Sequence, residues 1–192
     1  MKGISIIIVN YNVKYFLRQC LQSIKGSDYD GVVEVLVVDN NSTDGSELMM
    51  REEFPEIRYI YNTSNVGFSK ANNQGIALAT QPYTLILNPD TILQENTLKV
   101  CAEYLEQNQQ VGAVGAKMVD GSGTYLPESK RGFPTPLNAL FKLTGLSKLF
   151  ANSKFFNSYY QGHLSTDIVN PCLLYTSPSP RDATLSRMPS SA

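Results

Sequence analysis

Asparagine and aspartate gather at four places in the first half of the chain, each directly after a short apolar run. The four segments are 10–12, 39–42, 62–68 and 88–90. Carboxylate and amide side chains hydrogen-bond polar ligands, and their oxygens are the ligands that hard divalent cations prefer. Any single segment has an alternative interpretation as a turn or helix cap, because these residues favour both. Four such segments in succession favour a binding site.

The segment Asn88-Pro89-Asp90 indicates the most specific chemistry. It follows the apolar run Leu85-Ile86-Leu87, and its proline restricts the turn that presents Asp90. A carboxylate held at that point suits a divalent cation, and such a cation neutralises a departing diphosphate. Taken alone, the tripeptide is also compatible with a simple turn before a helix cap.

Strand and helix patterns alternate through the first 120 residues and position these segments. We expect strands at 4–9, 34–38, 58–61, 84–87 and 111–119, and helices at 13–24, 42–53, 68–79 and 98–105. Ser42 or Thr43 is the expected cap of the second helix. The alternation predicts an α/β fold with a mostly parallel central sheet and helices on both faces. In such sheets ligands bind beyond the carboxyl ends of the strands, where the four polar segments lie.

Composition excludes several classes of protein. The chain has 192 residues, of which 42% are hydrophobic and 17% charged, with a net charge of −1. This is enough for one domain with a core and too apolar for a disordered chain. The charge balance argues against nucleic-acid binding, and the short apolar runs cannot span a bilayer. Because no signal segment follows Met1, we expect a cytoplasmic protein.

The cysteines and the histidine do not suggest a metal centre. Cys20, Cys101 and Cys172 have no metal-ligand spacing, and the first two fall on apolar helix faces, as small buried residues do. His163 is the single histidine, which argues against a zinc site built on histidines.

Two common nucleotide-binding motifs are missing after the first predicted strand. The turn at 10–14 contains no glycine, whereas a dinucleotide-binding fold needs Gly-x-Gly-x-x-Gly there. A Walker-type phosphate loop is also missing from the sequence. A nucleotidyltransferase with a similar sheet remains an alternative, although that class usually carries a glycine-rich basic loop at this position.

The four segments together resemble the family 2 glycosyltransferases, and most closely their rhamnosyltransferase-like branch. The resemblance covers residues 4–120 and rests on the ordered motifs SIIIVNYN, EVLVVDNNSTDG, NVGF with ANNQG, and LILNPD. It implies a Rossmann-like A-type glycosyltransferase fold and a UDP- or dTDP-linked sugar donor. It also implies inverting transfer of the sugar to an acceptor hydroxyl on a glycan or lipid-linked molecule, in cell-surface glycan assembly.

The resemblance also implies roles for individual residues. Asn10 and Tyr11 would line the nucleotide pocket, and Asp39 would hydrogen-bond the pyrimidine with Asn41 nearby. The floor under the ribose and phosphates would come from Asn65, Gly67 and Phe68, with Lys70 and Asn73 close by. Asn88 would face the ribose, and Asp90 would hold Mg²⁺ or Mn²⁺ on the diphosphate. Asn88 stands where the family's Asp-x-Asp motif has its first aspartate, which removes one charge from the expected cation site.

No catalytic base is assigned in this sequence. The family supplies one from an acidic motif well after Asp-x-Asp, and Asp167 is the only acid between Glu128 and Asp182. Residues 173–192 are rich in serine and proline and look like translated adaptor sequence, with a natural tail as the alternative. We therefore expect a donor-binding subdomain at 1–120, a partial acceptor-side region at 121–172 and a disordered tail at 173–192. A truncated chain that binds nucleotide sugar without turnover is the alternative to an active enzyme.

A basic amphipathic stretch follows the predicted sheet. Between Glu128 and Lys154 there are five basic residues and one acid, and a helix is expected at 136–150. Residues 130–154 form either a packed helix with a solvated face or a surface for the inner face of an anionic membrane.

Overall fold

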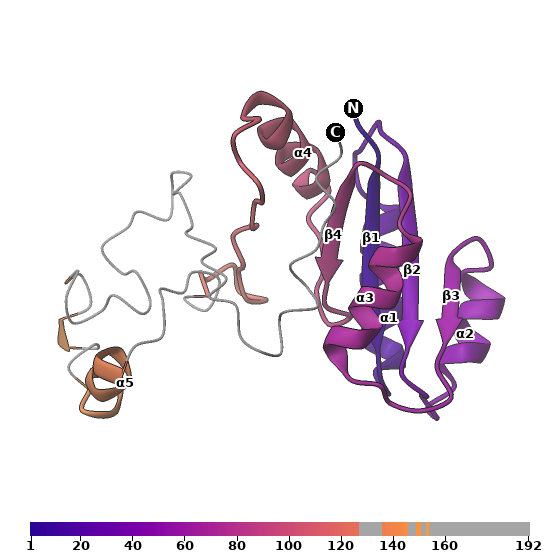
Figure 1. The fold of residues 1–192 in the computed structure, drawn as a ribbon, viewed down its shortest axis with the longest axis horizontal. Coiled ribbons are helices and arrows are strands. Elements are labelled where there is room, and N and C mark those ends of the chain that lie inside the picture. The colour runs from indigo at the N-terminus through magenta and orange to yellow at the C-terminus, as the bar shows by residue number, and fades with distance from the viewer. Residues whose placement is uncertain (127–135, 146–148, 151–152, 154–192) are drawn as a thin grey trace. The chain divides into compact units, whose positions relative to one another are not determined.

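The computed structural model describes residues 1–126, 136–145, 149–150 and 153 (Figure 1). The chain divides into two compact units, Met1–Val114 and Gly115–Ala192. His163, Asp167, Cys172 and the predicted tail lie outside the described residues.

The first unit is built on a four-stranded parallel sheet in the order β3-β2-β1-β4. Its strands are β1 (Ile4–Asn10), β2 (Val33–Asp39), β3 (Arg58–Tyr61) and β4 (Tyr83–Leu87). Every residue of β1 is buried, as its unbroken β-branched run predicts for a central parallel strand. The register places Asn10 beside Asp39 and Asp39 beside Tyr61, so the strands end at one edge.

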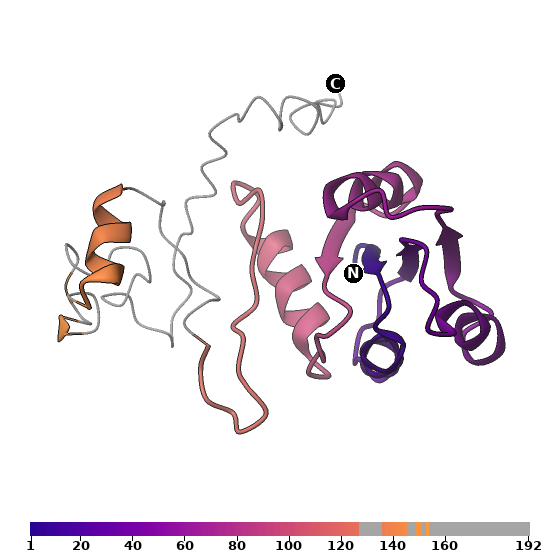
Figure 2. The ribbon, with the colours of Figure 1, turned by 90° about the horizontal axis from the view of Figure 1, so that it is seen from below.

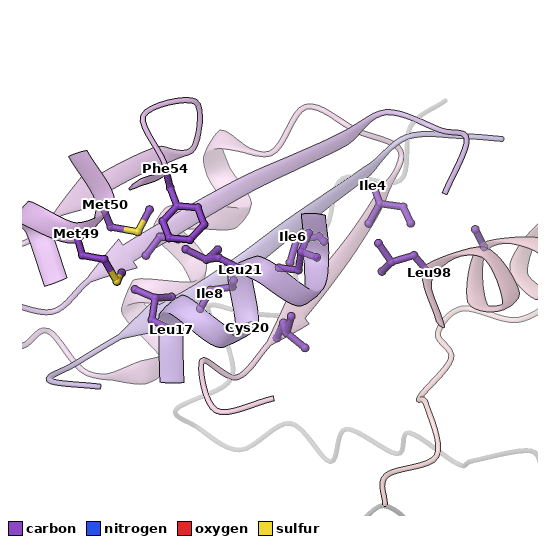
Figure 3. Packing of buried hydrophobic residues seen from close by; sticks show 14 residues of the cluster. Ile4, Ile6, Ile8, Leu17, Cys20, Leu21, Met49, Met50, Phe54 and Leu98 are labelled. Atoms are coloured by element: carbon purple, nitrogen blue, oxygen red, sulfur yellow. The ribbon is translucent and has the colours of Figure 1, made fainter. Parts of the chain in front are cut away.

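Helices lie on both faces of this sheet (Figure 2). Helices α1 (Lys14–Lys25) and α2 (Ser46–Glu53) pack on the face that carries Ile6 and Ile8. Figure 3 shows this core, in which Leu17 and Leu21 of α1 lie against the isoleucines. Helix α4 (Thr97–Gln107) adds Leu98 and Ala102 to the same cluster.

Helix α3 (Phe68–Leu78) lies on the opposite face, over β1 and β2. Ala71 packs with Val9 and Val38, the residues just before the ends of the two central strands. Farther along α3, a Cβ atom on Gly75 would lie 2.4 Å from Cγ2 of Ile7. Only glycine permits this close approach, and the small residues of α3 therefore set its distance from the sheet.

The predicted elements of the first unit are confirmed with two corrections. Helix α2 begins at Ser46 and follows Gly45, whose φ is +83°, so neither Ser42 nor Thr43 caps it. The strand predicted at 111–119 is wrong, because this segment is irregular and only Val119 makes an isolated bridge, with Tyr125. Two glycines, at 112 and 115, interrupt its valines, and most of its residues are exposed rather than buried.

The described part of the second unit contains helix α5 (Pro136–Leu143). The helix predicted at 136–150 is shorter than expected, since Gly145 has a φ of +78° and Thr144 forms a turn on the carbonyl of Leu140. Most basic residues of the 130–154 stretch lie outside the described residues. None of the helices in the described part of the chain combines the length and apolar character that a bilayer crossing requires.

Candidate functional site

The ends of β1 and β2 are locked together by buried side chains. Asn10 and Asp39 have no exposed surface. The Asn10 Nδ2 atom donates to Asp39 Oδ2 at 2.5 Å and to Ser42 Oγ at 3.0 Å. The other carboxylate oxygen of Asp39 accepts from the Ser42 backbone N–H at 2.6 Å. Asp39 therefore organises the loop after β2 as well as ending the strand.

A second set of hydrogen bonds joins the loops that follow these strands. Ser42 Oγ also accepts from the Asn12 N–H at 2.9 Å, and Asn12 Oδ1 accepts from the Thr43 N–H at 2.8 Å. Asn12 and Asn41 have φ values of 55° and 67°, a left-handed conformation that asparagine tolerates better than most residues. The asparagines predicted from their chemistry thus also allow the left-handed backbone conformation of these turns.

Asp44 fixes the start of α1 from the neighbouring loop. Its Oδ2 accepts from the Lys14 N–H at 2.7 Å, and its Oδ1 accepts from the hydroxyl and N–H of Ser46. Burial alone would raise the pKa of Asp44, but these hydrogen bonds to the charged form outweigh it and lower the pKa. The first turns of α1 and α2 therefore share one carboxylate.

The end of β3 joins this network through residues to which the sequence analysis assigned no individual role. The Asn62 N–H donates to the Asp39 carbonyl at 2.9 Å, and its side chain donates to Asn40 Oδ1 at 3.1 Å. Asn62 and Gln74 of α3 exchange two amide hydrogen bonds of 2.9 and 3.0 Å. The Tyr61 hydroxyl donates to Asn41 Oδ1 at 2.6 Å. The signal for Asn62 was its place directly after β3.

Residues 65–68 form an open turn that leads into α3. Asn65 Oδ1 accepts from the Gly67 N–H at 2.9 Å, and Gly67 has φ 86° and ψ 162°, which is essentially a glycine-only conformation. Phe68 follows with 56% of its surface exposed. Asn73 lies one turn farther along and is half-buried, while Lys70 is exposed. The first N–H groups of α3 consequently begin next to the ends of the strands.

The carboxyl end of β4 is held from one side by α1. Cys20 Sγ lies 3.7 Å from the Asn88 carbonyl, and Ser23 Oγ accepts from the Leu93 N–H at 3.1 Å. Burial raises the pKa of the Cys20 thiol to about 12, and the nearby Asp90 carboxylate contributes to that rise. Cys20 is therefore a protonated, buried packing residue, as its position on the apolar face of the helix predicted.

Asn88 and Asp90 themselves are exposed. The Asp90 carboxylate makes no hydrogen bond or ion pair with any residue that the structure describes. Within the described residues, no group of three His, Cys, Asp or Glu side chains could hold a metal ion. One free carboxylate fits Mg²⁺ or Mn²⁺ only where a ligand's phosphates complete the coordination, which is the usual pattern for Mg²⁺.

The predicted residues lie at one edge of the sheet. Asn10, Asp39 and Asn41 are brought together in the locked loops, and Tyr11 is 50% exposed beside them. Asn65, Gly67, Phe68 and Asn73 lie in the connection from β3 into α3. Asn88 and Asp90 follow β4, whose Leu87 pairs with Ile8 of β1. The fold is thus of the doubly covered α/β class that binds ligands at the carboxyl edge.

The chain belongs to glycosyl transferase family 2, because residues 5–169 match that family. Among curated relatives, glycosyltransferase GlyG of Streptococcus pneumoniae is 26% identical over 117 residues, which cover 58% of this chain and 38% of GlyG. Abequosyltransferase RfbV of Salmonella typhimurium is 31% identical over 114 residues, which cover 56% of this chain and 34% of RfbV. The chain therefore matches little more than a third of these relatives.

Similar solved structures identify the fold. Residues 1–349 of Staphylococcus aureus TarS, in complex with UDP-GlcNAc, match with a TM-score of 0.52 and 24% identity, covering 72% of this chain and 38% of TarS 1–349. The mannosyltransferase PcManGT from Pyrobaculum calidifontis, in complex with GDP-Man and Mn²⁺, matches with a TM-score of 0.52 and 27% identity, covering 65% and 36%. The sheet is that of an A-type glycosyltransferase fold.

Proposed function

We propose that this chain carries the donor-binding part of a glycosyltransferase that moves a sugar from a nucleotide-diphosphate sugar to an acceptor hydroxyl. The observation that carries the proposal is the edge of the sheet where a hydrogen-bonded loop network lies beside a free, exposed carboxylate at Asp90. The network offers a fixed polar surface, and the carboxylate offers a place for a cation on the diphosphate.

The donor would lie along the loops after β1, β2 and β3. We assign the nucleotide to Asn10, Tyr11, Asp39 and Asn41, the ribose and phosphates to Asn65, Gly67 and Phe68, and supporting contacts to Asn73 and Asn88. Asp39 would contribute by fixing the loop after β2 beside the nucleotide, because its side chain is buried and hydrogen-bonded through both carboxylate oxygens. The N-terminus of α3 presents backbone N–H groups of the kind that hold phosphate oxygens.

Asp90 would hold Mg²⁺ or Mn²⁺, and a cation bound there neutralises charge on the leaving diphosphate. PcManGT, which is described in complex with Mn²⁺, supports the use of a divalent cation. Asn88, in place of a second acid, leaves the site with one negative charge fewer. The sulfur contact of Cys20 to the Asn88 carbonyl and the Ser23 contact to Leu93 hold the loop in place from α1.

The reaction we propose is an inverting displacement. The acceptor oxygen forms a bond to the anomeric carbon as the bond to the diphosphate oxygen breaks on the opposite face, and a carboxylate base takes the hydroxyl proton. None of the described residues is assigned as that base. Asp167, the only acid between Glu128 and Asp182, lies outside the described residues.

The second candidate function is nucleotide-sugar binding without turnover. It is favoured by the partial span of this chain, which covers 34–38% of the length of the two relatives described above. Isothermal titration calorimetry with UDP-, GDP- and dTDP-sugars, with and without Mn²⁺, tests donor binding. Release of nucleoside diphosphate then separates the two functions, because a binding protein without turnover releases none. Failure to bind any of these donors would contradict both.

The acceptor we propose is a glycan or lipid-linked hydroxyl in cell-surface glycan assembly. Relatives named abequosyltransferase and poly-β-1,6-N-acetyl-D-glucosamine synthase support a role in polysaccharide assembly. The Asn-Pro-Asp sequence at 88–90 supports the rhamnosyltransferase-like branch.

We further propose that the protein works in the cytoplasm, with residues 130–154 touching the inner face of the membrane. The support is the basic, amphipathic sequence of this stretch. Flotation with liposomes that contain or lack anionic lipid tests the contact. Equal recovery with both kinds of liposome would contradict it.

A further inference from the structure

Asn72 of α3 has a buried amide oxygen without a hydrogen-bond partner. The residue is 6% exposed, and its Nδ2 atom donates to the Phe68 carbonyl one turn earlier at 3.0 Å. Its Oδ1 has no hydrogen-bond partner among the residues that the structure describes. A buried carbonyl left unpaired costs free energy, and native proteins keep few of them. Asn72 belongs to the ANNQG motif, but the sequence analysis assigned it no role.

Asn72 lies on the part of α3 that packs near the carboxyl ends of the central strands. Its neighbour Ala71 packs with Val9 and Val38, just before the ends of β1 and β2. Successive residues of an α-helix are about 100° apart, so Asn72 and Gly75 are both turned from Ala71 in the same direction around α3. Gly75 faces Ile7 of β1. Asn72 therefore lies on the flank of α3 that faces away from β2. Ile86 of β4, which pairs with Ile7, is 44% exposed, so β4 is not fully covered there.

The fold does not require the polar amide of Asn72. The Phe68 carbonyl already accepts the backbone N–H of residue 72 within the helix, so the side-chain bond is an additional one. Asn10 differs, although its Oδ1 is also unpaired. The Asn10 side chain has no exposed surface, and its Nδ2 joins Asp39 and Ser42, so it holds the loops together.

The chemistry of a carbonyl oxygen limits what Asn72 can bind. Oδ1 only accepts hydrogen bonds, so its partner must carry an O–H or N–H group. Ionised phosphate oxygens are acceptors themselves and are therefore excluded. The side-chain bond to Phe68 fixes the rotation of the amide and so aims Oδ1 in one direction.

We propose that Asn72 Oδ1 accepts a hydrogen bond from a hydroxyl of the bound nucleotide sugar, either on the ribose or on the transferred sugar. Asn72 is then a specificity residue of the donor site, and this inference rests on the donor binding proposed above. Its position on α3 places it one turn beyond Phe68, on the same helix that would present backbone N–H groups to the phosphates.

The test uses Asn72→Leu and Asn72→Ala with three ligand pairs, all with Mn²⁺. The pairs are UDP with UDP-glucose, GDP with GDP-mannose, and dTDP with dTDP-glucose. For the ligand pair that the unaltered protein binds, we expect both variants to lower the affinity by about three- to tenfold, which corresponds to the loss of one hydrogen bond. Asn72→Leu should meanwhile raise Tm by a few degrees, because it replaces an unsatisfied buried oxygen with an apolar group.

The two ligands of a pair separate the two sources of the hydroxyl. Weaker binding of both assigns it to the ribose, whereas weaker binding of the nucleotide sugar alone assigns it to the transferred sugar. Asn108→Leu is the matched control, because Asn108 Nδ2 donates in the same way to the Tyr104 carbonyl, at 2.9 Å, at the end of α4. We expect this control to leave ligand affinity unchanged.

Two results would overturn the inference while the proposed function stands. One is ligand affinity in both Asn72 variants equal to that of the unaltered protein. The other is a fall in Tm together with affinity in Asn72→Leu, which would make the amide structural. If the unaltered protein binds none of the six ligands, the proposed function fails and the inference fails with it.

Discussion

The ends of β1, β2 and β3 use their polar side chains differently from the end of β4. After the first three strands, most of the buried amides, hydroxyls and carboxylates are hydrogen-bonded to one another, as in the contacts of Asn10 and Ser42 with Asp39. After β4, Asn88 and Asp90 are exposed, and Asp90 has neither a hydrogen bond nor an ion pair among the described residues. The same residue types therefore fix the loop conformation in one region and are exposed to a ligand in the other.

This difference separates two kinds of group in the candidate site, those that fix the loops and those that are exposed to a ligand. Groups that are already hydrogen-bonded keep backbone N–H groups and aromatic side chains in fixed positions before a ligand arrives. Groups left unpaired gain most from a ligand, because the ligand replaces only water around them. We therefore expect changes in the first region to act mainly on folding, and changes after β4 to act mainly on binding.

The largest expected effect is on the free carboxylate. Asp90→Ala should remove the cation dependence of donor binding, so that the variant binds the donor equally well with and without Mn²⁺. Calorimetry of both proteins with a nucleotide sugar measures this ratio. Asp30→Ala, which removes an exposed acid before β2, is the control and should keep the Mn²⁺ effect. An unchanged Mn²⁺ effect in Asp90→Ala would refute the cation role.

The next effect tests the locked region. Asp39→Asn should lower the free energy of unfolding by about 3 kcal/mol, because one amide hydrogen would face either Asn10 Nδ2 or the Ser42 N–H, both donors. Urea denaturation of the variant and of Asp30→Asn measures the difference. A stability equal to that of the unaltered protein would show that the buried carboxylate is dispensable for the loops.

A smaller effect is expected at the turn before α3. Gly67→Ala should cost about 1–2 kcal/mol of stability, since φ 86° with ψ 162° strains any residue that has a Cβ atom. Gly112→Ala is the matched control, because Gly112 has open space around it and no positive φ. Equal urea midpoints for the two variants would contradict the strain expected at Gly67.

The smallest effect concerns pH. The pKa of Asp44 is lowered in the folded protein, so its hydrogen bonds stabilise the fold above the unfolded pKa and are lost as pH falls. Stability should therefore decline from about pH 5 downwards, and this part of the decline should be smaller in Asp44→Asn. Urea midpoints measured between pH 3 and pH 7 provide the comparison. Parallel curves for the two proteins would argue against a contribution from Asp44.

The sequence allowed the sheet to be predicted well because its strongest signals are local. The β-branched run of β1 and the three-to-four-residue spacing of α1 each lie within a dozen residues. The prediction failed at 111–119, where the valines have a strand-like pattern but glycines interrupt them and most residues are exposed. It also failed at Ser42, because a hydroxyl that suits a helix cap serves the loop of β1 instead.

The candidate site was predictable only as a list of strand ends. Its polar residues are visible in the sequence, and parallel strands must bring them to one edge. Which of them pair was not visible, because the Asn10–Asp39 bond joins residues 29 positions apart and the lock between Asn62 and Gln74 depends on where α3 packs. Hydrogen bonding at such separations is set by strand register and helix position.

By itself, the sequence determined the order of strands and helices and the polar composition of the edge where a ligand would bind. Tertiary structure alone decided that Asp39 is buried and hydrogen-bonded. It also decided that, within the described part of the chain, the Asp90 carboxylate and the Asn72 amide oxygen have no hydrogen-bond partner. The physical reason is that burial and hydrogen-bond partners depend on neighbours far apart in the chain, whereas the hydrophobic period that forms a strand or a helix is local.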